Sequence, residues 1–182
     1  MKTTDVGIVE SDGQRRLFPS ESLRLAGEAV VAEHMTAEMA GDLDRTLATF
    51  ADVPEYDIVP PRGLRRGVPA VRELLGHLLG AFPVLVLEVV RLRHCSDAVS
   101  IEGIMRGTHS GTSAGIPASG QSRDLRAAVF FHFDGDRLTR ETVYYDELTL
   151  LVQRGAHDPA APSGQYVDRT LRSSSPAAYR RS

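Results

Sequence analysis

The sequence predicts an α+β fold in which a curved, cone-shaped β-sheet, mixed or antiparallel, wraps around N-terminal helices. Apolar residues recur every three or four positions over residues 21–50 and 67–82, which is the spacing of amphipathic helices. From residue 84 the period changes to two, which is typical of strands. Helices followed by a run of strands indicate helices gathered on one face of a sheet. The concave face of such a sheet would enclose a cavity for a small apolar molecule.

Three helices are predicted in the N-terminal half. The first follows Ser20, a residue type that caps helices, and ends at Gly41. A short second helix is predicted over residues 43–50. The third follows Gly67 and stops before Pro83, because the residue before a proline disfavours the helical conformation.

Five strands are predicted, at residues 54–59, 84–93, 99–108, 125–133 and 138–151. The Gly- and Ser-rich segment between the third and fourth of them is too long for a simple hairpin turn. We therefore expect this segment to form a lid or rim over the cavity.

One domain is expected over residues 21–155. Residues 1–20 lack a sustained hydrophobic period and are predicted to be a flexible tail with a short strand at 6–9. Residues 156–182 are dominated by Pro, Ser, Ala and Arg, a composition that predicts disorder.

Composition and charge exclude several classes of partner. The chain has 182 residues, 42% of them hydrophobic, and a formal net charge of −3, so we expect no nucleic-acid partner. No apolar run reaches the roughly 20 residues of a membrane span, and the first residues have no apolar segment of a secretory signal. We therefore expect a cytoplasmic protein without a membrane partner. The single cysteine, Cys95, excludes an internal disulfide and a thiolate metal cluster.

The predicted last strand carries polar groups in an otherwise apolar segment. Glu141, Tyr144, Tyr145 and Asp146 lie within GDRLTRETVYYDELTLLVQRG, which begins at a turn signal. Buried carboxyl and phenol groups cost free energy unless they are paired or used in chemistry. This strand is therefore the first place where we expect a site.

Two histidines are candidates for proton transfer. His34 and Glu38 are four residues apart and share one face of the first helix, either at the mouth of the cavity or as a surface pair. His109 lies in GTHSG, where small neighbours leave room for a ligand, and a neutral imidazole can carry protons near neutral pH. Alternatively, His109 holds the loop in place.

Two carboxyl groups are the other catalytic candidates. Glu102 lies between apolar residues in a strand predicted to be interior, where burial would raise its pKa. It would otherwise pair with a cross-strand arginine such as Arg91. Asp146 is predicted to be a base or the partner of a histidine, and its alternative role is to accept backbone or tyrosine hydrogen bonds.

Aromatic and apolar side chains are expected to bind the substrate: Tyr56, Tyr145, Phe131 and Met105. The six histidines form no metal-binding motif, and no Gly-rich phosphate loop joins a strand to a helix. We therefore predict no metal and no cofactor.

Three motifs carry a resemblance to a known family: GDLD, the block DAVSIEGIMRGTHSGTSAGIPASG, and the ending VYYDELTLLVQRG. Over residues 22–155 the chain resembles the SnoaL-like polyketide cyclases of the nuclear-transport-factor-two-like superfamily. The resemblance implies a cone-shaped α+β barrel that is often dimeric through its sheet. It also implies cofactor-free acid–base chemistry, such as an aldol ring closure in secondary metabolism, on an apolar polyketide-like carbonyl compound.

The chain departs from the family at one important position. Members of this family end in Trp-Asp, two further residues and Asp, and the first aspartate is their acid–base group. Aligning the last aspartate with Asp146 puts Val143 at the catalytic position. The resemblance therefore implies either that His34, Glu102 or His109 moves the proton, or that this member performs different chemistry.

Two alternatives to a cyclase, isomerase or lyase remain open at this point. One is a non-catalytic ligand-binding or assembly module of the same fold, which the missing aspartate favours. The other is an enzyme like an epoxide hydrolase, which would need an Asp–Arg–Asp cluster in the cavity.

Overall fold

A computed structural model describes residues 19–59, 63–112 and 117–153 of the chain. The helices of the described residues are α1 (Glu21–Met39), α2 (Leu43–Ala48), α3 (Val68–Ala81) and α4 (Glu147–Gln153). The strands are β1 (Phe50–Val59), β2 (Gly63–Arg66), β3 (Val86–His94), β4 (Ala98–Thr108), β5 (Ser122–Asp134) and β6 (Arg137–Tyr145). The predictions of a tail with a strand at 6–9 and of disorder over 156–182 fall outside the described residues, apart from residues 19 and 20, which lead into α1.

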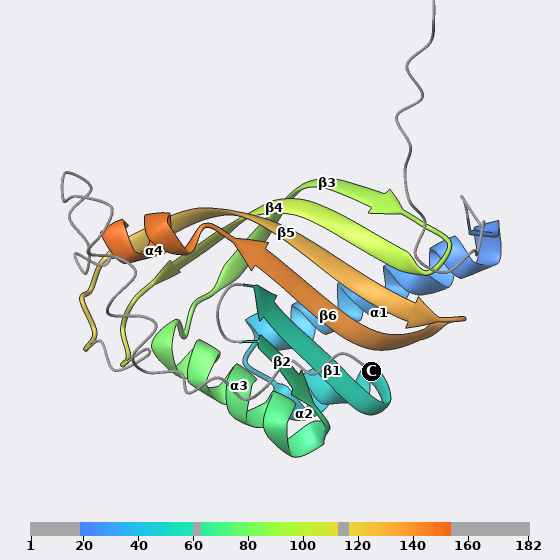
Figure 1. The fold of residues 1–182 in the computed structure, drawn as a ribbon, viewed down its shortest axis with the longest axis horizontal. Helices are drawn as coiled ribbons and strands as arrows, with labels where there is room; N and C mark the ends of the chain where they lie inside the picture. The colour runs from blue at the N-terminus through green and yellow to red at the C-terminus, as the bar shows by residue number, and fades with distance from the viewer. Residues whose placement is uncertain (1–18, 60–62, 113–116, 154–182) are drawn as a thin grey trace, which may run out of the picture.

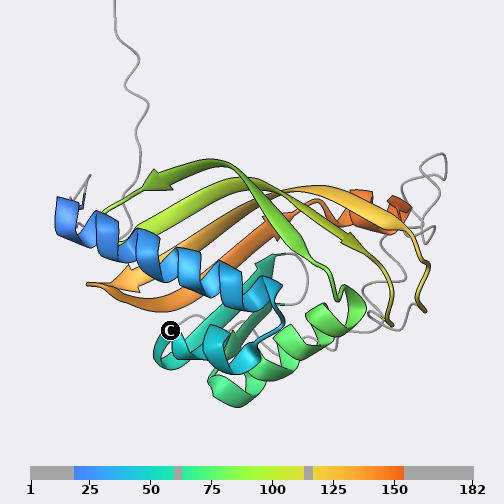
Figure 2. The same ribbon diagram turned by 180° about the vertical axis from the view of Figure 1, so that it is seen from behind.

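The strands form one curved sheet that does not close on itself, in the order β2-β1-β6-β5-β4-β3. β1 runs parallel to β6, whereas every other pair of neighbouring strands is antiparallel. Figures 1 and 2 show α1 crossing one face of the sheet, with α2 and α3 below it. The predicted α+β class and the curved sheet around N-terminal helices are confirmed.

The first helix forms where its capping residue and apolar spacing predict it. The Ser20 hydroxyl accepts a hydrogen bond from the Leu23 amide at 3.3 Å, which satisfies an amide of the first turn. Its buried residues are Gly27, Val31, His34 and Ala37, which recur every three or four positions. His34 therefore lies on the buried side of α1, which faces the sheet.

Several element boundaries differ from the prediction. α2 ends at Ala48 and β1 begins at Phe50, four residues earlier than expected. β2 was not predicted, because its four exposed residues show no apolar alternation. The predicted last strand is also too long: β6 ends at Tyr145, and the apolar run that follows forms α4. A short apolar run fits either a strand or a helix, and periodicity alone does not separate them.

The hydrophobic core lies between the helices and the concave face of the sheet. It includes Val31 of α1, Leu75 of α3 and, from three neighbouring strands, Ile101, Phe131 and Leu138. No helix in the described part of the chain has the length and hydrophobicity that a membrane crossing requires.

Replacing Gly103 with alanine should destabilise the fold. A Cβ at this position of β4 would lie 2.7 Å from a Leu87 methyl carbon and 2.8 Å from the Glu88 carbonyl oxygen, so β3 would have to shift. We expect the free energy of unfolding to fall by about 1–3 kcal/mol, as measured by urea denaturation. A Cβ at Gly80 of α3 meets nothing within 4 Å, so Gly80→Ala should leave stability unchanged or raise it slightly. Equal effects of the two changes would contradict the close packing of β3 against Gly103.

Candidate active site

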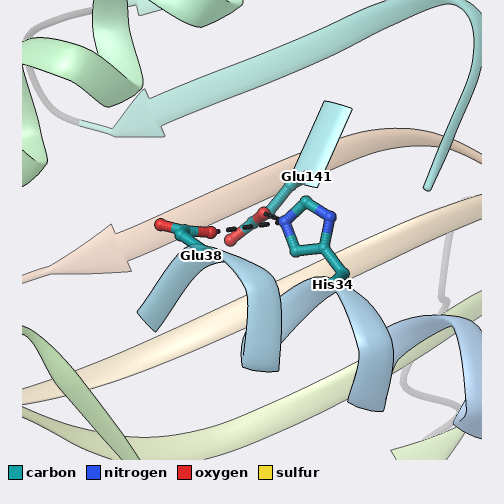
Figure 3. A group of neighbouring side chains, drawn as sticks. All are labelled: His34, Glu38 and Glu141. Carbon is teal, nitrogen blue, oxygen red and sulfur yellow. Dashed lines mark ion pairs between the residues drawn. The ribbon is translucent and has the colours of Figure 1, made fainter. Parts of the chain in front are cut away.

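A buried polar cluster joins α1 to β1 and β6. His34 Nε2 lies 2.8 Å from Glu141 Oε2 and 3.3 Å from Glu38 Oε2 (Figure 3). The Tyr56 hydroxyl donates to Glu141 Oε1 at 3.0 Å and lies 3.4 Å from Glu38 Oε1. Four ionisable side chains thus share one hydrogen-bonded site.

The secondary structure explains this convergence. His34 and Glu38 are one helical turn apart on α1, so both point toward the sheet (Figure 3). Tyr56 and Glu141 are directly paired in the parallel register of β1 and β6. Since side chains alternate between the faces of a sheet, these two partners emerge on the same concave face.

The orientation of the His34 ring is fixed by a hydroxyl group. The Thr49 hydroxyl donates to the Thr46 carbonyl oxygen at 2.7 Å, so its oxygen accepts the N–H of His34 Nδ1 at 2.7 Å. The rings of Phe50 and Phe131 pack against the imidazole in T-shaped arrangements, with ring centroids 5.0 and 5.7 Å away. His34 Nε2 is therefore directed at the two carboxyl groups.

The cluster holds a proton strongly. Burial alone would lower the pKa of His34, but its contacts with Glu141 and Glu38 outweigh burial and raise this pKa to about 10. Burial and the charge of Glu38 raise the pKa of Glu141, against the opposing effect of His34. Burial, followed by the two carboxylates, keeps the pKa of the Tyr56 phenol well above its usual value.

The cluster forms one end of a largely apolar cavity that opens to solvent. The volume inside the cavity is about 100 Å³, and open space adjoins it at the mouth. Glu38, Tyr56 and Glu141 contribute to its wall, whereas His34 lies behind them. The rest of the wall consists of Met35, Met39, Ile58, Leu78, Leu79, Phe82, Leu85, Leu87, Met105, Gly107, Arg123, Leu125, Val129, Phe131, Val143, Tyr145 and Leu150. The arrangement places proton-transfer groups beside a space suited to an apolar molecule.

The structure brings five of the predicted site residues to this region. Tyr56, Tyr145, Phe131 and Met105 line the cavity, and His34 belongs to the polar cluster. The interpretation of His34 and Glu38 as a surface pair is wrong, because His34 is fully buried.

Two predicted carboxyl groups lie elsewhere. Glu102 points away from the core, with its side chain 50% exposed, and pairs with Arg91 at 3.1 Å. The expectation of a buried Glu102 is therefore wrong, and the cross-strand pair is present instead. Asp146 is exposed and accepts hydrogen bonds from the amide and hydroxyl of Thr149 at 3.1 and 2.6 Å. These bonds cap α4 and lower the pKa of Asp146. The carboxylate of Asp146 is therefore bonded to Thr149 and is not part of the cluster.

His109 is buried but separate from the cluster. Its Nδ1 accepts the amide N–H of Ser119 at 3.3 Å, which joins the two ends of the loop, and its ring stacks on Phe82 with centroids 5.4 Å apart. His109 is not among the residues that line the cavity. Its surroundings match the alternative interpretation, a histidine that holds the loop. The lid prediction concerns a loop whose middle residues, 113–116, are outside the described ranges.

Sequence reasoning did not select Glu38 and Glu141 as catalytic candidates. The signal for Glu38 was its spacing from His34, and the signal for Glu141 was a carboxyl group in an apolar strand.

Among the described residues, His34, Glu38 and Glu141 are also the one group whose ligand atoms all lie close enough for a metal ion, within 4.8 Å of one another. Two of these atoms, His34 Nε2 and Glu141 Oε2, already contact each other as an ion pair that shares a proton.

Comparison with known proteins identifies the family. The sequence model of the SnoaL-like polyketide cyclases matches residues 29–154. The chain belongs to this family. A search of curated proteins gave no significant match.

Solved structures share the fold of this SnoaL-like chain. A protein from Jannaschia sp. CCS1 named for the same family has a TM-score of 0.69 and 19% identity, covering 80% of this chain and 100% of its own. A phenazine biosynthesis-related protein from Pseudomonas aeruginosa has a TM-score of 0.68 and 14% identity, covering 83% and 94%. A protein from Xanthomonas campestris pv. campestris named for polyketide cyclases has a TM-score of 0.66 and 23% identity, covering 72% and 98%. At these identities the likeness shows the nuclear-transport-factor-two-like fold.

The stability of the protein should depend on the protonation of His34. An imidazole whose pKa is about 10 in the folded state and ~6.5 in the unfolded state stabilises the fold below pH ~6.5, and this contribution is lost as the pH rises toward 10. We expect the wild-type free energy of unfolding to fall by up to about 1.4 kcal/mol per pH unit in this window, and the His34→Gln variant to show a flatter profile. Urea denaturation across the window measures both.

A histidine on the surface provides the control for this measurement. His77 is exposed on α3, so His77→Gln should follow the wild-type profile. Parallel profiles for the wild type and His34→Gln would contradict the assignment.

Proposed function

We propose that the chain is a cofactor-independent enzyme that performs acid–base chemistry on an apolar carbonyl compound, as in a polyketide cyclase. The observation that carries this proposal is the buried cluster of His34, Glu38, Tyr56 and Glu141 at one end of an apolar cavity. A carboxyl group with a raised pKa beside an apolar space is suited to removing a proton next to a carbonyl group.

Glu141 is the general base in this proposal. Its carboxylate takes a proton from the carbon next to the substrate carbonyl, and the electron pair of the broken C–H bond moves into an enolate. The enolate carbon then forms a bond with a second carbonyl carbon of the same molecule. The resulting alkoxide takes back the proton from Glu141, which completes an aldol closure without a cofactor.

Tyr56 and His34 support this chemistry in different ways. Tyr56 lines the cavity and remains a phenol, so it can donate a hydrogen bond to Glu141 or to the enolate oxygen. His34 is a positioning residue, because it lies behind the cavity wall and holds the two carboxyl groups by its charge. Glu38, which is more exposed than Glu141, is the second carboxyl group that can pass protons to solvent.

The structure bears on the two alternatives. The cavity wall in the described part of the chain contains Arg123 but no aspartate, so it lacks the Asp–Arg–Asp cluster of an epoxide hydrolase. A ligand-binding module would not need two carboxyl groups and a histidine in one dry site, since burying them costs free energy. We therefore favour the enzyme.

Replacing Glu141 with glutamine should remove proton transfer. The test measures exchange of hydrogen for deuterium next to the carbonyl of β-tetralone and larger polycyclic ketones by NMR, which requires no knowledge of the natural substrate. We expect the wild type to accelerate this exchange and Glu141→Gln to lose about 100-fold or more of the acceleration, because an amide cannot accept the proton.

The same substitution at an exposed glutamate is the matched control. Glu73 lies on the outer face of α3, and Glu73→Gln should exchange the ketones at the wild-type rate. Wild-type rates in Glu141→Gln, or binding of these ketones by the wild type without exchange at any pH, would refute the enzyme and favour the ligand-binding module.

We also propose that the chain forms a homodimer through the convex face of its sheet. A shallow hollow on this face is lined by Ala128, Phe130, His132, Arg140, Thr142, Tyr144 and Asp57. Tyr144 is 45% exposed there, and its ring contacts Phe130 with centroids 5.8 Å apart. An exposed tyrosine that contacts a half-buried phenylalanine at the centre of a sheet face supports contact with a second copy.

A charge at Tyr144 should therefore separate the dimer. We expect Tyr144→Lys to sediment as a monomer at concentrations at which the wild type is a dimer, because a lysine would be desolvated at the interface. Leu25 of α1 is 52% exposed and lies away from this face, so Leu25→Lys should remain dimeric. A monomeric wild type would refute the interface.

A further inference from the structure

Each hydrogen-bond donor of the polar cluster lies close to both carboxyl groups. His34 Nε2 is 2.8 Å from Glu141 Oε2 and 3.3 Å from Glu38 Oε2 (Figure 3). The Tyr56 hydroxyl oxygen is 3.0 Å from Glu141 Oε1 and 3.4 Å from Glu38 Oε1. Both donors are nearer to Glu141, and Glu38 is a second acceptor within reach of each. The mechanism proposed above uses Glu141 as the base and gives no role to this doubled arrangement.

The surroundings of His34 restrict its Nε2–H group to these two acceptors. The other ring nitrogen is bonded to the Thr49 hydroxyl at 2.7 Å. Two aromatic rings pack against the imidazole, and His34 is fully buried. In the described part of the chain, the carboxylates of Glu38 and Glu141 are the anions that contact its Nε2. The charge of His34 therefore depends on these two groups.

Proton transfer in the proposed reaction removes the charge of Glu141. Once its carboxylate has taken the proton from the substrate carbon, Glu141 is a neutral carboxyl group, which is a weaker acceptor than a carboxylate. A buried imidazolium without an anionic partner is strongly unfavourable. Glu38 lies close enough to His34 Nε2 to be that partner.

We propose that Glu38 is a positioning residue: when Glu141 accepts the substrate proton, the N–H of His34 turns to Glu38, which stays ionised as the counterion of the imidazolium. This inference rests on the proposed function for the step in which Glu141 is protonated. The C–H bond of the substrate breaks and an O–H bond of Glu141 forms, whereas the N–H bond of His34 stays intact and only its acceptor changes. The hydroxyl of Tyr56 is released from Glu141 at the same time, so it can donate to Glu38 or to the enolate oxygen.

Glu38 also acts on Glu141 through its charge. Two carboxylates in one buried site disfavour each other, so the charge of Glu38 favours the protonated form of Glu141. Burial and this charge together raise the pKa of Glu141. Among the described residues, the titratable groups that face Glu141 are Glu38 and His34 of α1 and Tyr56 of β1. Removal of the charge of Glu38 should therefore make Glu141 a weaker base.

The Glu141→Gln variant mimics the state in which Glu141 is neutral, so it allows a test without turnover. The test follows the titration of the His34 imidazole by NMR of protein isotopically labelled in histidine. We expect the midpoint in Glu141→Gln to stay above the ~6.5 of an ordinary histidine, because Glu38 remains as the counterion. In the double variant Glu38→Gln, Glu141→Gln the midpoint should fall below that value, because burial then disfavours the charged ring without opposition.

Two outcomes of this titration would overturn the proposal. A midpoint below that of an ordinary histidine in Glu141→Gln would mean that Glu38 does not replace the lost anion. Equal midpoints in Glu141→Gln and in the folded double variant would mean that the charge of His34 does not depend on Glu38. His77 is the internal control, since it is exposed on α3 and should keep one midpoint in every variant.

A second test measures the deuterium exchange of β-tetralone against pH. We expect Glu38→Gln to exchange at least ~10-fold more slowly than the wild type, and the acid limb of its rate profile to lie about one pH unit lower, because Glu141 is then a weaker base. Glu38→Asp keeps the charge and should keep the acid limb near that of the wild type. Glu33→Gln is the matched control, since Glu33 is exposed on the same helix and should leave the profile unchanged.

The outcomes separate this inference from the proposed function. A wild type that does not exchange ketone protons would refute the enzyme, and the titration of His34 would still decide whether Glu38 replaces Glu141 as the counterion. Slower exchange in Glu38→Gln without a shift of the acid limb would overturn the proposal, because it would limit Glu38 to the passage of protons to solvent.

Discussion

The contact between His34 and Glu141 is the interaction on which the candidate site depends. It joins the first helix to the last strand across the concave face of the sheet, with both side chains almost completely buried. A buried ion pair offsets the cost of its desolvation only when its remaining hydrogen-bonding groups are also satisfied. Thr49 satisfies the other nitrogen of His34, and Tyr56 satisfies the other oxygen of Glu141. Each partner of the ion pair therefore has a supporting hydroxyl group. Removal of His34 would leave Glu141 as an unpaired buried charge, and removal of Glu141 would leave His34 with Glu38 alone.

This requirement connects the fold to the chemistry. The cluster exists only because β1 runs parallel to β6, which puts Tyr56 beside Glu141, and because α1 crosses the same face. The same burial that excludes water from the pair raises the pKa of Glu141. A carboxyl group on the convex face, such as Glu102, is paired with arginine in solvent and lacks this environment. The curved sheet thus determines which carboxyl groups are suited to proton transfer.

Local patterns in the sequence predicted much of the fold, and long-range pairing explains most of what they missed. The spacing of His34 and Glu38 on one helix face was visible, because a helical turn is a local property. The partner of His34 was not, because Glu141 is brought to it by the pairing of β1 with β6, in which Tyr56 and Glu141 are 85 residues apart in the sequence. Glu102 was misplaced although strand alternation carries the correct answer: Val99, Ile101 and Met105 face inward, so residue 102 faces outward. The two roles left open for Asp146 could not be separated from the sequence, because the apolar run after it fits a helix as well as a strand, and the structure shows it accepting backbone hydrogen bonds as the cap of α4.

In the proposed mechanism, Glu141 takes the role that the family resemblance implies for an aspartate at the position of Val143. Both residues lie on β6, two positions apart and on the same face, and both line the cavity. Glu141 pairs with Phe131 and Val143 pairs with Val129, so Glu141 lies two residues, about 7 Å, nearer the start of β6 than Val143 does. The longer side chain of glutamate suits this site, because it reaches both His34 and Tyr56. If the substrate reacts at Glu141, as proposed, its reacting carbon lies about 7 Å from the point at which an aspartate at position 143 would act.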